Sequence, residues 1–194
     1  MLDLANKKII LASASPRRKE LMAGLDIPFE IRVKESDESF PDSLEKENVA
    51  IYLAKKKSDT YIKDLKENEI LITSDTTVLK DGIIYNKPND EVEAISMLKA
   101  LSGQQHEVIT GVCIRSLEKE VSFDSRSIVK FKILEEDEIR YYVRKYKPFD
   151  KAGSYGIQEW LGYIAIERIE GSYFTIMGLP VHRIYEELKQ FDKK

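Results

Sequence analysis

A segment near the N-terminus, residues 13–19 (Ser-Ala-Ser-Pro-Arg-Arg-Lys), could bind an anion. Ser15 suits the N-cap of a helix, and the proline after it suits the first helical position. Three cations would then occupy the first turn, where the helix dipole favours negative charge, so we expect an anion to compensate them. Backbone N–H groups, the hydroxyls of Ser13 and Ser15 and the guanidinium groups of Arg17 and Arg18 suit a polyphosphate. The alternative is a solvated basic turn.

A second candidate is Asp75, which stands in an otherwise apolar run that is expected to form a strand. An unpaired carboxylate would be costly to bury there, so Asp75 needs a partner such as a metal ion or an activated water. A carboxylate is a suitable ligand for magnesium and a suitable base for water attack on phosphorus. The alternative is an aspartate exposed at the strand end and bonded to its own turn, and this segment alone does not decide.

Two lysines and a glycine-containing segment form a third, more scattered set. Lys57 falls on an expected helix, Lys87 precedes a proline, and residues 151–158 contain two glycines and end at Gln158. A glutamine side chain offers both a donor and an acceptor and could bind a base edge. Each signal is weak alone, because lysines are usually solvated and glycine pairs usually form turns.

Other common sites have no support in the sequence. His106 and His182 are isolated, so packing or capping fits them better than metal binding, and no spacing typical of zinc sites occurs. Cys113 lies in an apolar run and is expected to be a buried, inert thiol. Neither a Walker A pattern nor a Gly-x-Gly-x-x-Gly pattern is present.

Composition favours one globular unit, with two lobes around a cleft as an alternative. The 194 residues are 42% hydrophobic and 34% charged, enough for one sizeable core. The net charge of −3 provides no general field for a nucleic-acid backbone. Apolar stretches are far shorter than a membrane span, and no signal-peptide core is visible. We therefore expect a cytoplasmic protein with neither a nucleic-acid nor a membrane partner.

The elements expected to position these residues alternate between strands and helices. A strand, loop and helix open the chain, Asp81-Gly82 is a strong hairpin turn, Asn89 or Asp90 caps a helix that stops at Gly103, and the segment 148–180 is rich in glycine and turns. The mixture of hairpins and helical crossovers predicts a mixed α/β sheet. Strands are expected at 8–12, 29–33, 70–79, 83–86, 108–116 and 121–133, and helices at 17–25, 47–65, 89–103, 135–146 and 181–191.

Seven motifs, in this order, resemble those of the Maf family of nucleotide pyrophosphatases. They extend from residue 13 to residue 180, nearly the whole chain, and seven ordered motifs are far more specific than any one of them. The motifs are Ser13-Ala14-Ser15-Pro16-Arg17-Arg18, Leu53-Ala54-Lys55-Lys56-Lys57, Ser74-Asp75-Thr76-Thr77-Val78, Asn86-Lys87-Pro88, Leu98-Lys99-Ala100-Leu101-Ser102-Gly103, Lys151-Ala152-Gly153-Ser154-Tyr155-Gly156-Ile157-Gln158 and Met177-Gly178-Leu179-Pro180.

The resemblance implies a fold and a reaction. The fold would be an elongated mixed α/β sheet flanked by helices with a central substrate cleft, similar to inosine triphosphatases, in one domain over residues 1–194. Water would attack the α-phosphorus of a nucleoside triphosphate and release pyrophosphate, with a divalent cation, Mg or Mn, as cofactor. Asp75 matches the family's proton acceptor and metal-linked carboxylate, and Glu38 is a second candidate for metal contact. The triphosphate would be held by Arg17, Arg18, Lys57 and Lys87, with Ser13 and Ser15 nearby.

Substrate choice also follows from the resemblance. The Gly-Ser-Tyr-Gly-Ile-Gln form is similar to the subgroup that acts on dTTP and UTP, and Arg17, Thr76 and Gln158 match the positions associated with that choice. Gln158 could pair with the O4 and N3–H edge that thymine and uracil share. Glu159 and Asn86 depart from the family, because many relatives have glycine there. Glu159 adjoins Gln158, so this departure bears on substrate preference more than on the reaction.

Two other functions stay open from the sequence. A non-catalytic regulator of septum formation could bind a nucleotide without turnover, although a carboxylate beside a bound polyanion would repel it unless a metal intervenes. An enzyme of the same fold could act on purine or modified triphosphates such as ITP. The resemblance further suggests a homodimer and a role in limiting incorporation of modified nucleotides or in cell division arrest.

Overall fold

The computed structural model describes residue 4 and residues 7–192, which form a mixed α/β fold. A seven-stranded sheet has the order β2-β1-β3-β5-β6-β7, with β4 paired to β3. The β1–β2 and β1–β3 pairs are parallel, whereas β3–β4 and β6–β7 are antiparallel. This mixture confirms the predicted fold class. The strands are β1 Lys8–Leu11, β2 Phe29–Ile31, β3 Glu69–Lys80, β4 Ile83–Tyr85, β5 Gln105–Arg115, β6 Glu120–Phe131 and β7 Ile166–Glu170.

The helices also follow most of the expected pattern. Asp90 caps α3 by accepting a hydrogen bond from the N–H of Glu93 at 2.8 Å, as one of the two predicted caps. The α-helices are α1 Pro16–Ala23, α2 Val49–Asp59, α3 Glu91–Leu101, α4 Glu136–Tyr146, α5 Trp160–Ala165, α6 Tyr173–Met177 and α7 Val181–Asp192. Short 3-10 helices are η1 Lys46–Asn48, η2 Ile62–Asp64 and η3 Ala152–Ser154. None of the helices in the described residues is long and apolar enough to cross a membrane.

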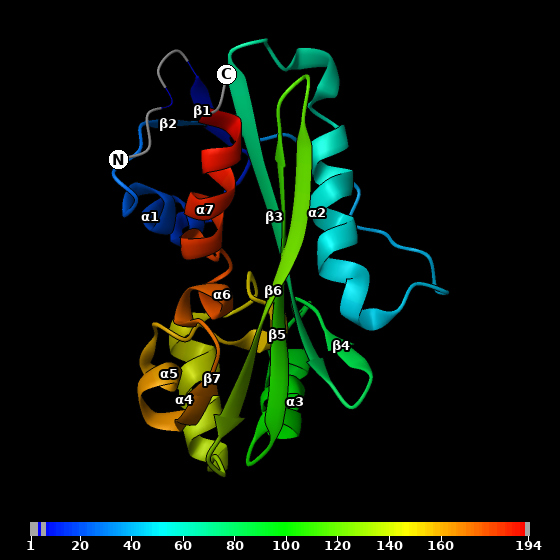
Figure 1. The fold of residues 1–194 in the computed structure, drawn as a ribbon. Coiled ribbons are helices and arrows are strands. Elements are labelled where there is room, and N and C mark those ends of the chain that lie inside the picture. The colour runs from blue at the N-terminus through cyan, green and yellow to red at the C-terminus, as the bar shows by residue number, and fades with distance from the viewer. Residues whose placement is uncertain (1–3, 5–6, 193–194) are drawn as a thin grey trace. The chain divides into compact units, whose positions relative to one another are not determined.

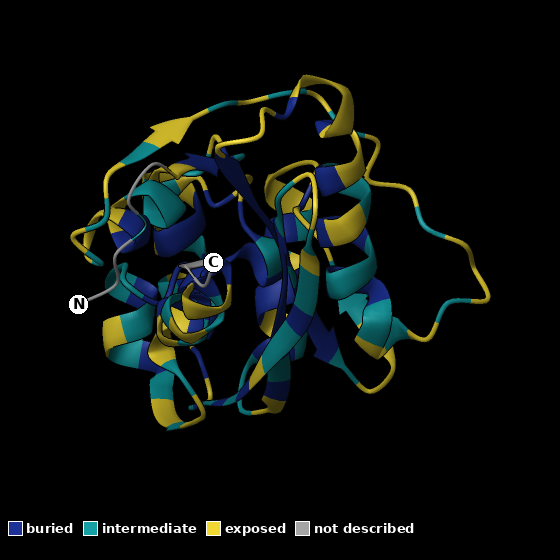
Figure 2. Ribbon diagram, turned by 45° about the horizontal axis from the view of Figure 1, so that its top comes forward, coloured by how far each residue is buried: buried dark blue, intermediate teal, exposed yellow. Residues whose placement is uncertain are grey.

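The chain divides into two compact units. Unit 1 contains the described residues up to Asp75, Thr110–Ser125 and the residues from Gly178 onward; unit 2 contains Thr76–Ile109 and Arg126–Met177. In unit 1, α1 and α7 lie on one side of the strands and α2 on the other (Figure 1). The core positions of β1 and β3, residues 9–11 and 70–72, are consequently almost inaccessible to solvent (Figure 2).

Helix α2 lies against β5 at a glycine. A Cβ on Gly111 would come within 2.3 Å of the backbone of Ala50 and Ile51, so only glycine allows this approach. The buried side of α2 carries Val49, Ala50, Leu53 and Ala54, which lie at helical spacing. Gly111 therefore fixes the distance of α2 from the sheet.

Two segments differ from the prediction. The helix expected over 47–65 ends at Asp59, and 3-10 turns occupy both of its flanks. The segment 148–180 contains η3, α5, β7 and α6, which the sequence analysis did not assign. Each has six residues or fewer. Elements this short are too brief for hydrophobic periodicity to distinguish them from turns.

The close approach at Gly111 predicts a large effect of a single methyl group. We expect Gly111→Ala to lower the free energy of unfolding by about 1–3 kcal/mol or more, because the backbone of α2 must move away. Urea denaturation measures this change. Gly24→Ala is the control, since Gly24 has helical φ and its Cβ would meet nothing closer than 3.4 Å. Equal stability of the two variants would contradict the packing described.

Candidate functional site

Unit 1 brings three of the predicted residues together. The Nζ atom of Lys57, on α2, lies 2.5 Å from Oδ1 of Asp75 on β3 and 2.8 Å from Oε1 of Glu38. The side chains of Lys57 and Asp75 are 15% and 12% exposed, whereas that of Glu38 is 49% exposed. Asp75 is thus buried within its strand, and the alternative of an exposed strand end is wrong. The partner that its burial requires is an ammonium group.

Arg18, which is partly buried, lies beside this cluster in unit 1. Its Nε donates to the carbonyl of Gly178 at 2.9 Å, and its Nη1 donates to the carbonyl of Ser74 at 2.8 Å. Burial lowers the pKa of Arg18; the charges of Asp75 and Glu38 raise it, while that of Arg17 lowers it. Because an arginine pKa is so high, the guanidinium keeps its charge. Arg18 therefore provides a fixed positive charge next to Asp75.

The segment before α1 is ordered around a hydroxyl. Ser13 Oγ accepts a hydrogen bond from the N–H of Ser15 at 3.2 Å. Ser15 occupies the N-cap with Pro16 as the first helical residue, as predicted, but its hydroxyl makes no capping bond. The expectation of side-chain capping was wrong in that respect. No acidic residue occupies the first turn of α1, where Arg17 stands, so the positive end of the helix dipole and the arginine charge add.

The remaining predicted residues belong to unit 2. Thr76 follows Asp75 along β3, Lys87 follows β4, and Gln158 lies in a turn before α5. The Oε1 atom of Gln158 is buried and has no hydrogen-bond partner within the part of the chain that the structure describes. A buried acceptor without a partner destabilises the folded state by about 1–3 kcal/mol, and a hydrogen-bond donor on a bound ligand would offset this penalty.

An aromatic cluster in unit 2 anchors the segment that leads to Gln158. His106 Nε2 and the hydroxyl of Tyr155 are 2.7 Å apart, and the rings of His106, Phe131 and Tyr155 make edge-to-face contacts. Burial lowers the pKa of His106 to about 3, with a further contribution from Lys80, and burial raises that of Tyr155. The expectation that His106 is a packing group is confirmed. Cys113, in unit 1, is also buried as expected.

The carboxylates of unit 1 suit one kind of metal site. Among the described residues, no group of three or more His, Cys, Asp or Glu side chains could hold a metal ion. Glu38 and Asp75 nevertheless converge on the same ammonium group. Magnesium is commonly bound by one or two carboxylates together with substrate phosphates, without a complete protein cage. The two carboxylates fit that arrangement.

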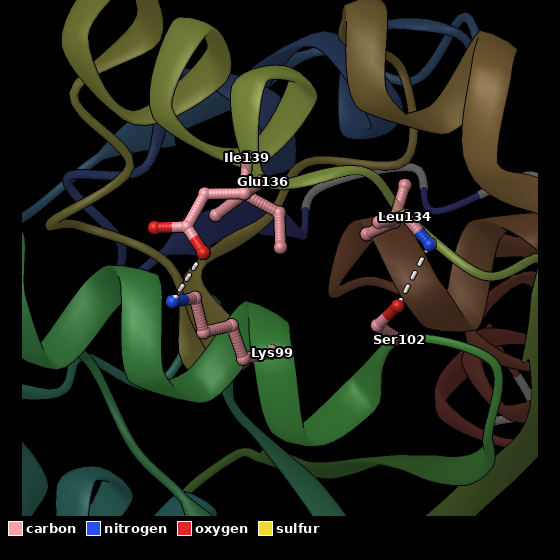
Figure 3. A pocket seen from close by; sticks show the side chains of 5 residues that line it. All are labelled: Lys99, Ser102, Leu134, Glu136 and Ile139. Carbon is pink, nitrogen blue, oxygen red and sulfur yellow. Dashed lines mark hydrogen bonds and ion pairs between the residues drawn. The ribbon is translucent and has the colours of Figure 1, made fainter.

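A surface recess in unit 2 is a separate feature. It measures about 300 Å³ and is lined by Lys99 and Ser102 of the α3 region and by Leu134, Glu136 and Ile139 of the α4 region (Figure 3). Lys99 pairs with Glu136 at 2.8 Å, and Ser102 accepts from the N–H of Leu134 at 2.7 Å. These polar groups already satisfy one another, so the recess is a seam between packed helices.

Two sets of contacts were not anticipated. Gly178 lies in the last of the seven motifs but had no predicted contact, and its carbonyl accepts from Arg18. Glu159 was expected only to depart from the family, whereas it accepts from Tyr142 and pairs with Lys151. The one available signal was a charged residue where glycine is usual. The partner residues are distant in sequence and left no local pattern.

The fold of this protein has a counterpart among solved structures. It is similar to the structure of the Staphylococcus aureus Ham1 protein, with a TM-score of 0.50, 15% identity and coverage of 95% of this chain and 97% of the other. This likeness concerns the fold alone. The sequence then identifies the family: residues 8–191 match the Maf-like protein family model, and the chain belongs to this family.

Curated relatives extend over almost the full chain. A protein of Porphyromonas gingivalis strain W83 is 51% identical and covers 98% of both chains. One of Parabacteroides distasonis is 50% identical over 97% of this chain and 98% of its own. One of Bacteroides fragilis strain YCH46 is 48% identical over 98% of this chain and 99% of its own. All three are named dTTP/UTP pyrophosphatase.

The Lys57–Asp75 pair predicts energetic coupling. In a double-mutant cycle with Lys57→Met and Asp75→Asn, followed by urea denaturation, we expect a coupling energy of about 0.5–3 kcal/mol, because each single change leaves a charge poorly compensated. Lys55 and Glu120 provide a control pair at 3.3 Å with side chains 50% and 30% exposed. The cycle with Lys55→Met and Glu120→Gln should give less than about 1 kcal/mol. Additivity at Lys57 and Asp75 would contradict the pairing.

The buried His106 predicts a pH dependence of stability. The unfolded chain takes up a proton on this histidine near pH 6.5, while the folded protein does so only near pH 3. Between these values, His106 lowers the free energy of unfolding by about 1.4 kcal/mol per pH unit as the pH falls. We expect His106→Gln to remove this contribution between pH 6.5 and 4.5, measured by urea denaturation. His182→Gln, at an exposed position, should keep the parental slope. Parallel slopes for the parent and His106→Gln would refute the assignment.

Proposed function

We propose that this protein is a nucleoside triphosphate pyrophosphatase that hydrolyses dTTP and UTP to the monophosphate and pyrophosphate. The observation that carries the proposal is the cluster in which Asp75 and Glu38 share Lys57 beside the partly buried Arg18. A carboxylate base beside cations suits water attack on a phosphoric anhydride. The shared name of relatives that are about half identical supports the choice of dTTP and UTP.

Each residue of the unit 1 cluster would have its own role in the reaction. A water oxygen forms a bond to the α-phosphorus, and the bond from that phosphorus to the α,β-bridging oxygen breaks. Asp75 accepts the proton that the water loses, and pyrophosphate leaves with the electron pair of the broken bond. Arg17, Arg18 and Lys57 stabilise the negative charge on the phosphate oxygens. Ser13 and Ser15 stay candidates for further phosphate contacts, as does Lys87 in unit 2.

A divalent cation, Mg or Mn, is part of the proposal. Asp75 and Glu38 would hold it together with phosphate oxygens of the substrate, since both already lie against one positive group. The cation would supply Lewis-acid neutralisation of phosphate charge. Lys57 can then exchange part of its contact with the carboxylates for contact with the phosphates.

Base choice is assigned to Gln158, with Thr76 as a second candidate. Uracil and thymine share an O4 acceptor and an N3–H donor. The buried Oε1 of Gln158 can accept from N3–H, while its amide nitrogen donates to O4. Arg17 completes the set that the family resemblance connects with this choice.

The reaction predicts a clear result for an isosteric change at Asp75. We expect pyrophosphate release from dTTP and UTP in magnesium or manganese, and its loss in chelator. Asp75→Asn should lower kcat by about 10²–10⁴-fold, because it removes the proton acceptor. Coupling to an added inorganic pyrophosphatase and phosphate detection measures the rate across a panel of canonical and modified triphosphates.

Asp59→Asn is the matched control, because Asp59 is an exposed aspartate at the end of α2 and pairs with Arg115. It should retain the parental rate. Full activity of Asp75→Asn would exclude Asp75 as the base. Hydrolysis of other bases alone would preserve the chemistry and overturn the role of Gln158. No release from any triphosphate would reject the enzyme in favour of a nucleotide-binding regulator.

A further inference from the structure

Gln158 lies in a four-residue turn in unit 2. The N–H of Glu159 donates to the carbonyl of Gly156 at 3.0 Å, which closes a β-turn with Gln158 as its third residue. Glu159 is also the N-terminal flanking residue of α5, with extended backbone angles. The orientation of Gln158 therefore depends on how firmly both ends of this turn are held.

One buried hydroxyl holds both ends. Tyr142 of α4 is inaccessible to solvent, and its hydroxyl accepts from the N–H of Gly156 at 3.0 Å. The same hydroxyl donates to Oε2 of Glu159. The first residue of the turn and the side chain of the last residue are thus joined through a single rigid group.

Lys151 fixes the other oxygen of the same carboxylate. Its Nζ lies 3.1 Å from Oε1 of Glu159, and the two side chains are only 8% and 19% exposed. Glu159 lies close over the turn, because a Cβ on Gly156 would be 2.9 Å from its Cδ. A carboxylate held at both oxygens and packed on the backbone has little freedom to change rotamer.

The backbone of the turn is also supported from α5. A Cβ on Gly162 would lie 1.7 Å from the carbonyl oxygen of Ile157, so the helix backbone directly contacts the residue before Gln158. Ile157 is itself buried. Gln158 therefore lies between Ile157, which packing immobilises, and Glu159, which Tyr142 and Lys151 hold.

Rigidity at this position has a chemical consequence for base choice. A carboxamide presents a donor and an acceptor, and a rotation of 180° exchanges them. One orientation complements the N3–H and O4 of uracil and thymine, and the other complements the N3 and N4–H₂ of cytosine. Discrimination between these bases consequently requires a glutamine that is held in one orientation.

We propose that Glu159, clamped by Tyr142 and Lys151, is a positioning residue that fixes the turn carrying Gln158 and thereby sets the preference for uracil and thymine over cytosine. This inference rests on the proposed function, since it concerns how the same enzyme selects its substrate. The carboxylate makes the turn rigid without touching the reacting phosphate.

Steady-state kinetics with UTP and CTP test the proposal. Glu159→Ala and Tyr142→Phe should raise KM for UTP and reduce the ratio of kcat/KM for UTP to that for CTP about tenfold, the equivalent of one lost hydrogen bond. Turnover number for UTP should change less than about threefold, since the residues that act on phosphate are untouched. Glu159→Gln should retain most of the discrimination, because its amide oxygen can still accept from Tyr142.

Tyr146→Phe is the matched control. Tyr146 is on the same helix and stacks on Tyr142, with the two ring centroids 5.1 Å apart. Its hydroxyl takes part in no hydrogen bond within the described residues. It should keep the parental KM and discrimination. Parental discrimination in Glu159→Ala, or an equal loss for UTP and CTP with a fall in kcat, would overturn the proposal in favour of a structural role.

Calorimetric titration with UMP and CMP separates this proposal from the reaction itself. If the parent protein hydrolyses no triphosphate, the proposed function fails, yet binding still tests the positioning role. Glu159→Ala should weaken UMP binding about tenfold more than CMP binding. Equal weakening, or a parent that does not distinguish UMP from CMP, would reject the role of Glu159.

Discussion

The constraint on which unit 1 depends is the burial of a carboxylate within a strand. Asp75 is 8% exposed as a whole residue and lies in β3, where an uncompensated charge would strongly destabilise the folded state. Lys57 meets this requirement from α2, and α2 can come close enough only because β5 has a glycine at position 111. One electrostatic requirement therefore accounts for the position of a helix, the identity of a glycine and the location of the candidate catalytic group.

The same cluster contains two cations that are held in different ways. Arg18 is bonded to two backbone carbonyls, so its charge is fixed in place before any ligand arrives. Lys57 instead contacts two carboxylates, one of them half-exposed. Preorganised charges reduce the reorganisation that a developing negative charge would otherwise require. The two cations thus differ in their partners: backbone carbonyls bind Arg18, whereas carboxylates bind Lys57.

The turn that carries Gln158 in unit 2 depends on different interactions. No charge needs to be stabilised at Gln158; the backbone of a small turn is held instead. Tyr142, Glu159 and Lys151 hold this backbone with a hydroxyl, a carboxylate and an ammonium that satisfy one another in a nearly dry environment. Buried polar networks of this kind specify a single conformation when all of their members are paired.

The sequence by itself determined the family, the mixed α/β class, most long elements and the residue types of the candidate site, because these depend on ordered motifs and local periodicity. The Asp81-Gly82 hairpin and the cap at Asp90 follow from neighbours within a few residues. Only the tertiary structure decided which cation pairs with Asp75, that Arg18 bonds to Gly178, and that Glu159 bonds to Tyr142. Arg18 and Gly178 are 160 positions apart, and no local pattern encodes such a contact. The partner of a buried charge depends on which elements the fold brings side by side, and this is decided only when the whole core packs.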